Sequence, residues 1–424
     1  MIGADFVLRR AGTLATLAGP APRLGRALSD LAVRRGAALA ARGGRIAWVG
    51  DDQQCDAAVS PLPGAVIVDA AGAAVVPGFV DPHTHLAFTG DRDGEIRRRL
   101  AGATYQEIAA EGGGILRSVQ ATRAASVEEL AAALRGRLDE MLLQGTTTAE
   151  VKSGYGLSLE TELRSLEAIA AAAAAHPITV VPTFLGAHEV PPEYRGRRAD
   201  YVHLLVEEMI PRVAEEGRAR FCDVFCEEGV FSVDETRRIL EAARAHGLGL
   251  RLHADELAGS GGAELAGALG ARSADHLVQV SPAGIAALAR SGCAATLLPA
   301  AAFYLRLGRF APARAIVDGG APLALATDGN PGGGLSPSMP FVMTVATFAM
   351  GLSLEEALAA STLNAAYSLG LERERGSLEV GKHADLVVLR SERLLDLLRV
   401  GVPAIRTVVK DGRVVVHHGR LAQE

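Results

Sequence analysis

The chain has 424 residues, 49% of them hydrophobic and 22% charged, a balance typical of a soluble globular protein and unlike a disordered one. Its net charge is −6, with both signs spread along the chain, so we expect neither a nucleic-acid partner nor a membrane surface. Four cysteines are too few for a disulfide framework, and no signal-peptide pattern is seen, so we expect a cytoplasmic protein with reduced thiols.

The two ends of the chain have the same sequence pattern. Residues 1–74 contain short β-like runs separated by glycine turns, and residues 377–424 contain further runs joined by the hairpin signal "KDGR". Neither end holds enough apolar sequence for a core of its own. We therefore predict one small β-sandwich domain built from residues 1–74 together with residues 377–424.

Residues 75–376 carry short apolar or β-branched runs, most of them followed by a helical pattern. The run at 126–145 is helical in period, and the run at 232–247 opens on Ser232 with Glu235 three residues later, as in a capping box. Eight such strand-like runs imply parallel βαβ units and predict an α/β fold, a (β/α)₈ TIM-type barrel. The runs are "AAVVPGFVD", "GTTTAEVK", "ITVVPTFLGAH", "ARFCDVFCEEG", "LGLRLHADE", "ARSADHL", "CAATLLP" and "APLALATDG".

Histidines gather where these strands are predicted to end. In a barrel of this kind the active site forms at the C-terminal ends of the strands. His83 and His85 lie two positions apart, so on a strand their imidazoles face the same side and can converge on one ion. His253 from the fifth strand and Asp328 from the eighth would complete a nitrogen and oxygen site suited to zinc or ferrous iron.

Each of these residues also has a simpler interpretation. A lone buried histidine, such as His188 or His276 taken alone, is more often a satisfied core residue than a functional one. The aspartate of "ATDGNPGGG" could be a turn former. The glycine runs "EGGGI" and "NPGGGLS" lack the spacing of a phosphate-binding loop. Glu227 and Glu228 could be loop surface.

With these residues laid out, the sequence resembles the amidohydrolase superfamily and, within it, the imidazolonepropionase family of histidine degradation. The segment "PGFVDPHTHLAFTGDR" is similar to the family's first-strand signature. Five later blocks, "TAEVKSGYGL", "PTFLGAHEVP", "LHADE", "SADHL" and "ATDGNPG", occur in the family's order, and the resemblance spans nearly the whole chain.

The resemblance implies a metal-dependent hydrolase that opens the cyclic amide of 4-imidazolone-5-propanoate to give N-formimidoyl-L-glutamate. It implies one divalent metal, Zn²⁺ or iron (Fe²⁺ or Fe³⁺), and a possible homodimer. Carried over position by position, it implies the metal ligands His83, His85, His253 and Asp328. The implied substrate contacts are Arg92, Tyr105, Tyr155, His188, Asn330, Gly332 and Gly333, and the implied catalytic residues are Glu256, His276 and Asp328. Which of the last three is the general base stays open.

The chain departs from the family pattern at a few positions. Gly329 and Gly333 stand where phenylalanine and serine are usual, which removes any side-chain contact at 333, and Ala300 stands where glycine is usual. Many superfamily members bridge two metals with a carbamylated lysine on the fourth strand, but here that strand has no lysine, and Lys152 lies on the second. We therefore predict one metal, with Lys152 as structural or electrostatic support.

Two rival functions remain at this stage. One is another mononuclear amidohydrolase, such as a deaminase or a different cyclic-amide hydrolase, because every such enzyme needs activated water. The other is a non-catalytic scaffold that kept the barrel, although such proteins typically lose metal ligands and all four are present here.

Overall fold

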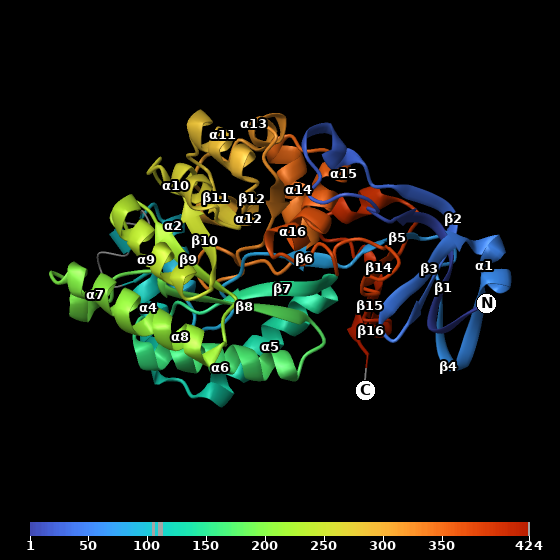
Figure 1. The fold of residues 1–424 in the computed structure, drawn as a ribbon, viewed down its shortest axis with the longest axis horizontal. Coiled ribbons are helices and arrows are strands. Elements are labelled where there is room, and N and C mark those ends of the chain that lie inside the picture. Colours follow the sequence, from blue (N-terminus) through green and yellow to red (C-terminus); the bar gives the residue numbers. More distant parts are fainter. Residues whose placement is uncertain (104–106, 109–112, 423–424) are drawn as a thin grey trace.

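The computed structural model describes residues 1–103, 107–108 and 113–422, which form a barrel with a separate sheet beside it (Figure 1). Within these residues eight parallel strands follow one another in chain order around the barrel, β6 to β13. This confirms the predicted (β/α)₈ fold. The barrel strands are β6 (Phe79–Asp81), β7 (Thr146–Lys152), β8 (Thr179–Ala187), β9 (Phe221–Cys226), β10 (Gly249–Ala254), β11 (Ser273–His276), β12 (Ala294–Leu297) and β13 (Leu323–Leu325).

Helices cover the outside of the barrel. Every residue of β7 and β9 is buried, as expected for strands with helices on one side and the packed barrel interior on the other. The helices of the described residues that surround the barrel are α2 (Asp93–Leu100), α4 (Ile115–Ala124), α5 (Val127–Leu143), α6 (Leu159–Ala174), α7 (Arg198–Leu204), α8 (Ile210–Glu216), α9 (Val233–Ala245), α10 (Gly262–Leu269), α11 (Pro282–Ser291), α12 (Pro299–Leu305), α13 (Ala313–Asp318), α14 (Met339–Met350), α15 (Leu354–Ala360) and α16 (Leu363–Ser368).

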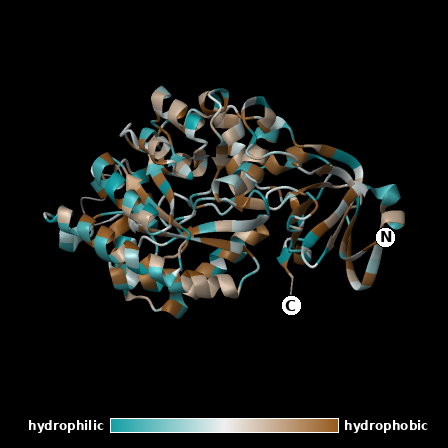
Figure 2. Ribbon diagram, in the orientation of Figure 1, coloured by the Kyte–Doolittle hydropathy of each residue, from teal (hydrophilic) through white to brown (hydrophobic). Residues whose placement is uncertain are grey.

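The predicted helix signals are confirmed. The side chains of Ser126 before α5 and Ser232 before α9 each accept a hydrogen bond from the backbone N–H three residues later. The carboxylate of the glutamate at that position accepts a hydrogen bond from the serine N–H. Helix α9 buries residues spaced three or four apart, among them Ile239, Leu240 and Ala243, and Figure 2 shows the mixed hydrophilic and hydrophobic colouring of such helices. Among the described helices, none combines the length and apolarity required to span a bilayer.

Both ends of the chain contribute to one mixed sheet, as the sequence predicts. Among the described residues this sheet has nine strands, in the order β17-β16-β15-β14-β5-β1-β2-β3, with β4 paired to β1. Strands from the two ends share a hydrophobic cluster that includes Phe6, Leu39, Leu386 and Val409. The strands are β1 (Ile2–Ala15), β2 (Val33–Arg42), β3 (Arg45–Asp51), β4 (Val59–Asp69), β5 (Ala74–Pro77), β14 (Leu386–Leu389), β15 (Ile405–Lys410), β16 (Arg413–His417) and β17 (Arg420–Leu421), and α1 (Asp52–Ala58) joins β3 to β4.

The run "AAVVPGFVD" differs from the expectation of a single barrel strand. Its first half, β5, pairs with β1 and β14 in the terminal sheet, and only its second half, β6, is a barrel strand. The break falls at Gly78, where a Cβ atom would lie 2.3 Å from the Thr147 hydroxyl oxygen. Glycine is needed there because the chain passes closely over β7. The domain boundaries given above stay a prediction.

Candidate active site

The first and last barrel strands meet at the mouth of the barrel. His83 and His85 follow the end of β6, and Asp328 follows the end of β13. The Asp328 N–H donates to the His83 carbonyl at 3.1 Å, and the His85 N–H donates to the Gly329 carbonyl at 2.8 Å. These backbone bonds hold Asp328 beside the two histidines although it lies more than 240 positions from them in sequence.

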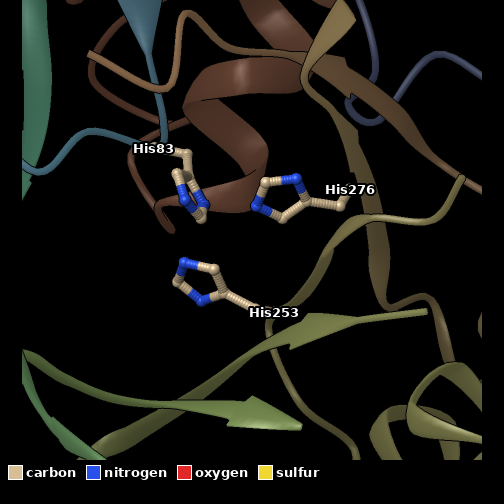
Figure 3. A group of neighbouring side chains, drawn as sticks. All are labelled: His83, His253 and His276. Carbon is tan, nitrogen blue, oxygen red and sulfur yellow. The ribbon is translucent and has the colours of Figure 1, made fainter. Parts of the chain in front are cut away.

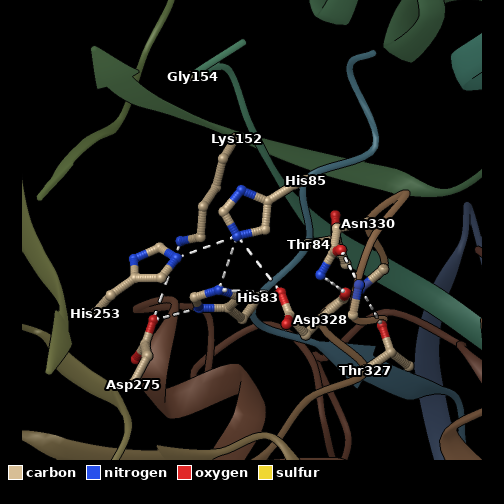
Figure 4. Close-up of polar contacts among 12 residues, drawn as sticks. His83, Thr84, His85, Lys152, Gly154, His253, Asp275, Thr327, Asp328 and Asn330 are labelled. Carbon is tan, nitrogen blue, oxygen red and sulfur yellow. Dashed lines mark hydrogen bonds and ion pairs between the residues drawn. The ribbon is translucent and has the colours of Figure 1, made fainter. Parts of the chain in front are cut away.

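Three imidazole nitrogens converge at this point (Figure 4). The Nε2 atom of His85 lies 3.1 Å from Nε2 of His83 and 3.1 Å from Nε2 of His253. An Asp328 carboxylate oxygen lies 3.6 Å from Nε2 of His83 and 3.5 Å from Nε2 of His85. All four residues are at most 4% exposed. The structure therefore brings together the four residues predicted as metal ligands.

The hydrogen bonds behind these rings indicate which nitrogen carries the proton. Nδ1 of His83 lies 2.6 Å from a carboxylate oxygen of Asp275, and Nδ1 of His253 lies 3.2 Å from one of Asp223. Since an ionised carboxylate only accepts, both Nδ1 atoms donate, and both Nε2 atoms present lone pairs to the centre. Lone pairs facing one another need a cation between them. The donor set therefore fits a metal ion such as zinc or iron.

Burial favours the neutral form of His83 and His85, the form that binds a metal. It lowers the pKa of His83 and of His85 well below the ordinary histidine value, with neighbouring positive groups adding to the effect. Burial also raises the pKa of Asp328 well above its usual range. A cation bound beside that carboxylate would act in the opposite direction, because it stabilises the charged form.

His276 lies on the other side of the cluster (Figure 3). One nitrogen each from His83, His253 and His276 falls within a 4.8 Å group, so His276 stands close to the candidate metal position. Its Nδ1 atom lies 3.4 Å from a carboxylate oxygen of Glu256. Its Nε2 atom is buried and makes no hydrogen bond among the described residues. Two of the three predicted catalytic residues, Glu256 and His276, are thus a contacting pair.

A pocket opens above the histidine cluster. It contains the predicted residues Glu256 and His276 and all but one of the predicted substrate contacts; Tyr105 lies outside the described residues. Its apolar lining residues include Ile115 of α4 and Leu305 at the end of α12. The pocket residues are His85, Arg92, Glu95, Arg99, Ile108, Ile115, Tyr155, His188, Phe225, His253, Glu256, Leu257, His276, Leu305, Leu307, Asp328, Asn330, Gly332 and Gly333.

Arg92 is a positive group that lines this pocket and has an unused donor. It is 4% exposed, and its Nε atom donates to the Ser118 hydroxyl at 3.0 Å. Its Nη2 atom is buried and makes no hydrogen bond among the described residues. A Cβ on Gly332 would lie 2.4 Å from Nη1 of Arg92, so glycine at 332 is required for this arginine position. A buried guanidinium with a free N–H fits an anionic ligand.

Asn330 organises the loop after β13. Its side-chain oxygen accepts from the N–H groups of Gly332 and Gly333 at 2.8 and 2.6 Å, and its amide donates to the Asp328 carbonyl at 2.7 Å. Gly333 therefore takes part through its backbone, and a Cβ there would lie 3.2 Å from the Leu305 side chain. A Cβ on Gly329 would lie 2.9 Å from Leu86. Both departures from the family pattern thus leave the loop's backbone contacts in place.

Two aromatic rings line the opposite wall of the pocket. His188 stacks on His85 with ring centroids 5.0 Å apart, and Tyr155 lies 5.2 Å from His188. Burial lowers the pKa of His188 to about 3, and its Nδ1 atom is 2.9 Å from the Gly154 carbonyl. His188 is therefore a neutral ring, with Nδ1 donating and Nε2 free to accept.

Sequence reasoning missed the carboxylates that shape the loops. Glu227, considered as loop surface, is 2% exposed and accepts from the N–H groups of Glu256, Leu257 and Ala258 at 3.1, 2.8 and 3.0 Å. Glu162 is fully buried and holds the loop that carries Tyr155 through three backbone N–H groups. No local pattern marks these residues, because their partners are backbone amides whose positions depend on the fold.

Comparison with known proteins agrees with this site. The amidohydrolase family model matches residues 74–416, and the chain belongs to that family. An imidazolonepropionase of Symbiobacterium thermophilum is 54% identical over 98% of both chains, and one of Myxococcus xanthus is 48% identical over 97% of both. Within the amidohydrolases, then, the chain is a member of the imidazolonepropionase family.

Solved structures of low sequence identity share the fold. A zinc-bound adenosine deaminase from Xanthomonas campestris matches with a TM-score of 0.71 at 19% identity, over 100% of this chain and 95% of that one. Guanine deaminase of E. coli matches with a TM-score of 0.70 at 18% identity, over 97% of this chain and 99% of that one. These matches support the barrel with its terminal sheet.

Proposed function

We propose that this chain hydrolyses the cyclic amide of 4-imidazolone-5-propanoate to N-formimidoyl-L-glutamate. The observation that carries the proposal is Arg92, a buried guanidinium with a free N–H in the same pocket as the histidine cluster. A substrate with a carboxylate arm on a small ring can place the arm on Arg92 and the ring carbonyl over the cluster. The 54% identical imidazolonepropionase supports this substrate class.

We propose His83, His85, His253 and Asp328 as the metal ligands, with zinc or iron as the ion. When bound, a divalent ion supplies a Lewis acid that polarises a carbonyl and lowers the pKa of a coordinated water. Asp275 and Asp223 fix the ring orientations of His83 and His253 from behind.

The chain's own residues then move the proton. Water adds to the ring carbonyl carbon, the bond from that carbon to the ring nitrogen breaks, and the nitrogen leaves with a proton. Burial, together with the nearby Asp328 charge, raises the pKa of Glu256 well above its ordinary value. The raised pKa favours the protonated form of Glu256, and we assign it as the donor to the leaving nitrogen. Asp328 is the base that takes the proton from water, and His276 donates to the developing oxyanion.

The substrate is oriented from both sides of the pocket. Arg92 binds the carboxylate, with its planar fork suited to bidentate contact. Tyr155 and His188 form the wall against which the planar ring packs, and the free Nε2 atom of His188 accepts a hydrogen bond from a ring N–H. The loop held by Asn330 closes the opposite side.

The test is to add imidazolonepropionate to the purified protein and follow the loss of its ultraviolet absorbance. Asp328→Ala should abolish turnover and release the metal, since it removes both a ligand and the base. Release of ammonia without loss of the ring would identify a deaminase instead. A protein without stoichiometric metal would support the scaffold interpretation and refute the proposal.

We further infer a cytoplasmic enzyme that forms a homodimer. The four cysteines are all free and buried, which suits a reducing compartment. Exposed apolar side chains near α12, α14 and the segment after Leu394 offer a surface for a second copy: Phe303, Phe348, Leu395, Val400 and Val402. Sedimentation of the purified protein would test the dimer, and a strictly monomeric species would refute it.

A further inference from the structure

A cluster of charged side chains lies inside the barrel next to the histidines. We define the buried charge cluster as Glu150, Lys152, Asp223, Arg251 and Asp275; each is 0% exposed. They come from β7, β9, β10 and β11, and within β7 they lie two positions apart, on the face that points into the barrel. Such groups are buried in proteins only when they are paired.

Lys152 is the cation that contacts all three carboxylates of this cluster, and Figure 4 shows it with one of them, Asp275. Its Nζ atom lies 2.6 Å from a carboxylate oxygen of Glu150, 2.7 Å from one of Asp223 and 4.0 Å from one of Asp275. An oxygen each of Asp223 and Asp275 lies within 4.8 Å of the other and of a nitrogen of His83, so two carboxylates stand close enough to bind one ion beside that ring. The second oxygen of Asp275 is buried and accepts no hydrogen bond among the described residues. The donors for a cation are thus present, and an ammonium group stands among them.

We propose that the ammonium of Lys152 takes the place of a second metal ion and limits this chain to one divalent cation. The formal charges support this. Three carboxylates face two cations in the buried charge cluster, which leaves a net charge of −1. Asp328 adds a further −1, and one divalent ion at the histidines would balance the sum of these six side chains. Without Lys152 the buried charge cluster itself would carry a net charge of −2, which a second divalent ion would balance.

This inference rests on the metal site of the proposed function. The test replaces Lys152 with methionine, which has a similar length and no charge, in the full-length chain. Wild-type and variant proteins are saturated with Zn²⁺, dialysed, and analysed for metal per chain. The wild type should retain one equivalent and K152M two. Thermal unfolding gives a second measurement: excess Zn²⁺ should restore most of the stability that K152M loses.

Lys410 provides a matched control. It is 3% exposed, and its Nζ atom lies 2.8 Å from a carboxylate oxygen of Asp385 in the terminal sheet, away from the histidines. K410M also removes a buried, paired ammonium, but it should leave the metal content at one equivalent. Its stability should show the wild-type dependence on Zn²⁺.

Each outcome supports or overturns the proposal. A folded K152M with one equivalent overturns it, and so does a wild type with two. If K152M fails to fold even with excess Zn²⁺, the shorter variant K152Q is measured, and failure of both overturns the proposal, because a second ion should replace the lost charge. A wild type that retains no metal refutes the proposed function instead, whatever the variants do.

Discussion

Asp275 offers a quantitative test of how the barrel holds its metal. Its carboxylate oxygen lies 2.6 Å from Nδ1 of His83 and 3.2 Å from Nη2 of Arg251, and all three side chains are fully buried. An ion on the opposite ring nitrogen, at the usual ligand distance, would lie roughly 7 Å from this carboxylate. With an effective dielectric constant of about 20, the attraction between this carboxylate and a divalent ion at that distance is about 4.7 kcal/mol.

Asp275→Asn should therefore weaken metal binding by up to about 2000-fold, since 1.4 kcal/mol corresponds to a factor of ten. This upper figure lies above the roughly 10- to 100-fold losses seen when residues behind metal ligands are replaced. The affinity is measured by competition with a chromophoric chelator at fixed pH. Asp385→Asn is the control, because Asp385 is equally buried and ion-paired but lies in the terminal sheet. Wild-type affinity in D275N would refute the electrostatic reasoning.

Three further predictions concern the pocket and its loops. R92A should raise KM about 10- to 100-fold with a smaller change in kcat, because it removes a charge-assisted bond to a substrate carboxylate; steady-state kinetics check this, and an unchanged KM would contradict it. E227A should lower kcat, because the N–H groups that place Glu256 lose their acceptor. The control is E228A, since Glu228 is exposed. Equal kinetics for E227A and E228A would contradict a positioning role for Glu227. Burial raises the pKa of Glu189, so the folded state binds its proton more tightly than the unfolded state and this contribution is lost as pH rises; E189Q should be more stable than wild type at pH 8, with the gain vanishing below about pH 4 in urea unfolding. A gain in the stability of E189Q that stayed constant from about pH 4 to pH 8 would contradict the raised pKa of Glu189 as its cause.

Local patterns were enough to predict the barrel and its four strand-end candidates. Alternation of short apolar runs with capped helical segments fixes the βαβ units, and the spacing of His83 and His85 fixes their common side. The switch of "AAVVPGFVD" between two sheets was not predictable in this way. Both halves are equally apolar, and only the approach of Gly78 to Thr147 in space separates them.

The buried charge cluster was also beyond the strand-end argument, although a signal was present. Glu150 and Lys152, and Arg251 and His253, alternate along strands that are otherwise apolar, which indicates one polar side facing inward. What the sequence could not supply is the pairing. The contact of Asp275 with His83 joins residues 192 positions apart, and it depends on the register of the whole barrel.

Strand β5 connects the terminal sheet to the segment that carries His83. It pairs with β1 on one side and β14 on the other, one strand from each end of the chain. It continues directly through Gly78 into the segment that carries His83. A change in how either terminus pairs with β5 should therefore shift the backbone that positions the His83 imidazole at the barrel mouth. Removal of the residues after Arg375 would spare every pocket residue of the described chain. It would, however, remove β14 and with it the strand pairing that holds β5, the strand that leads to His83.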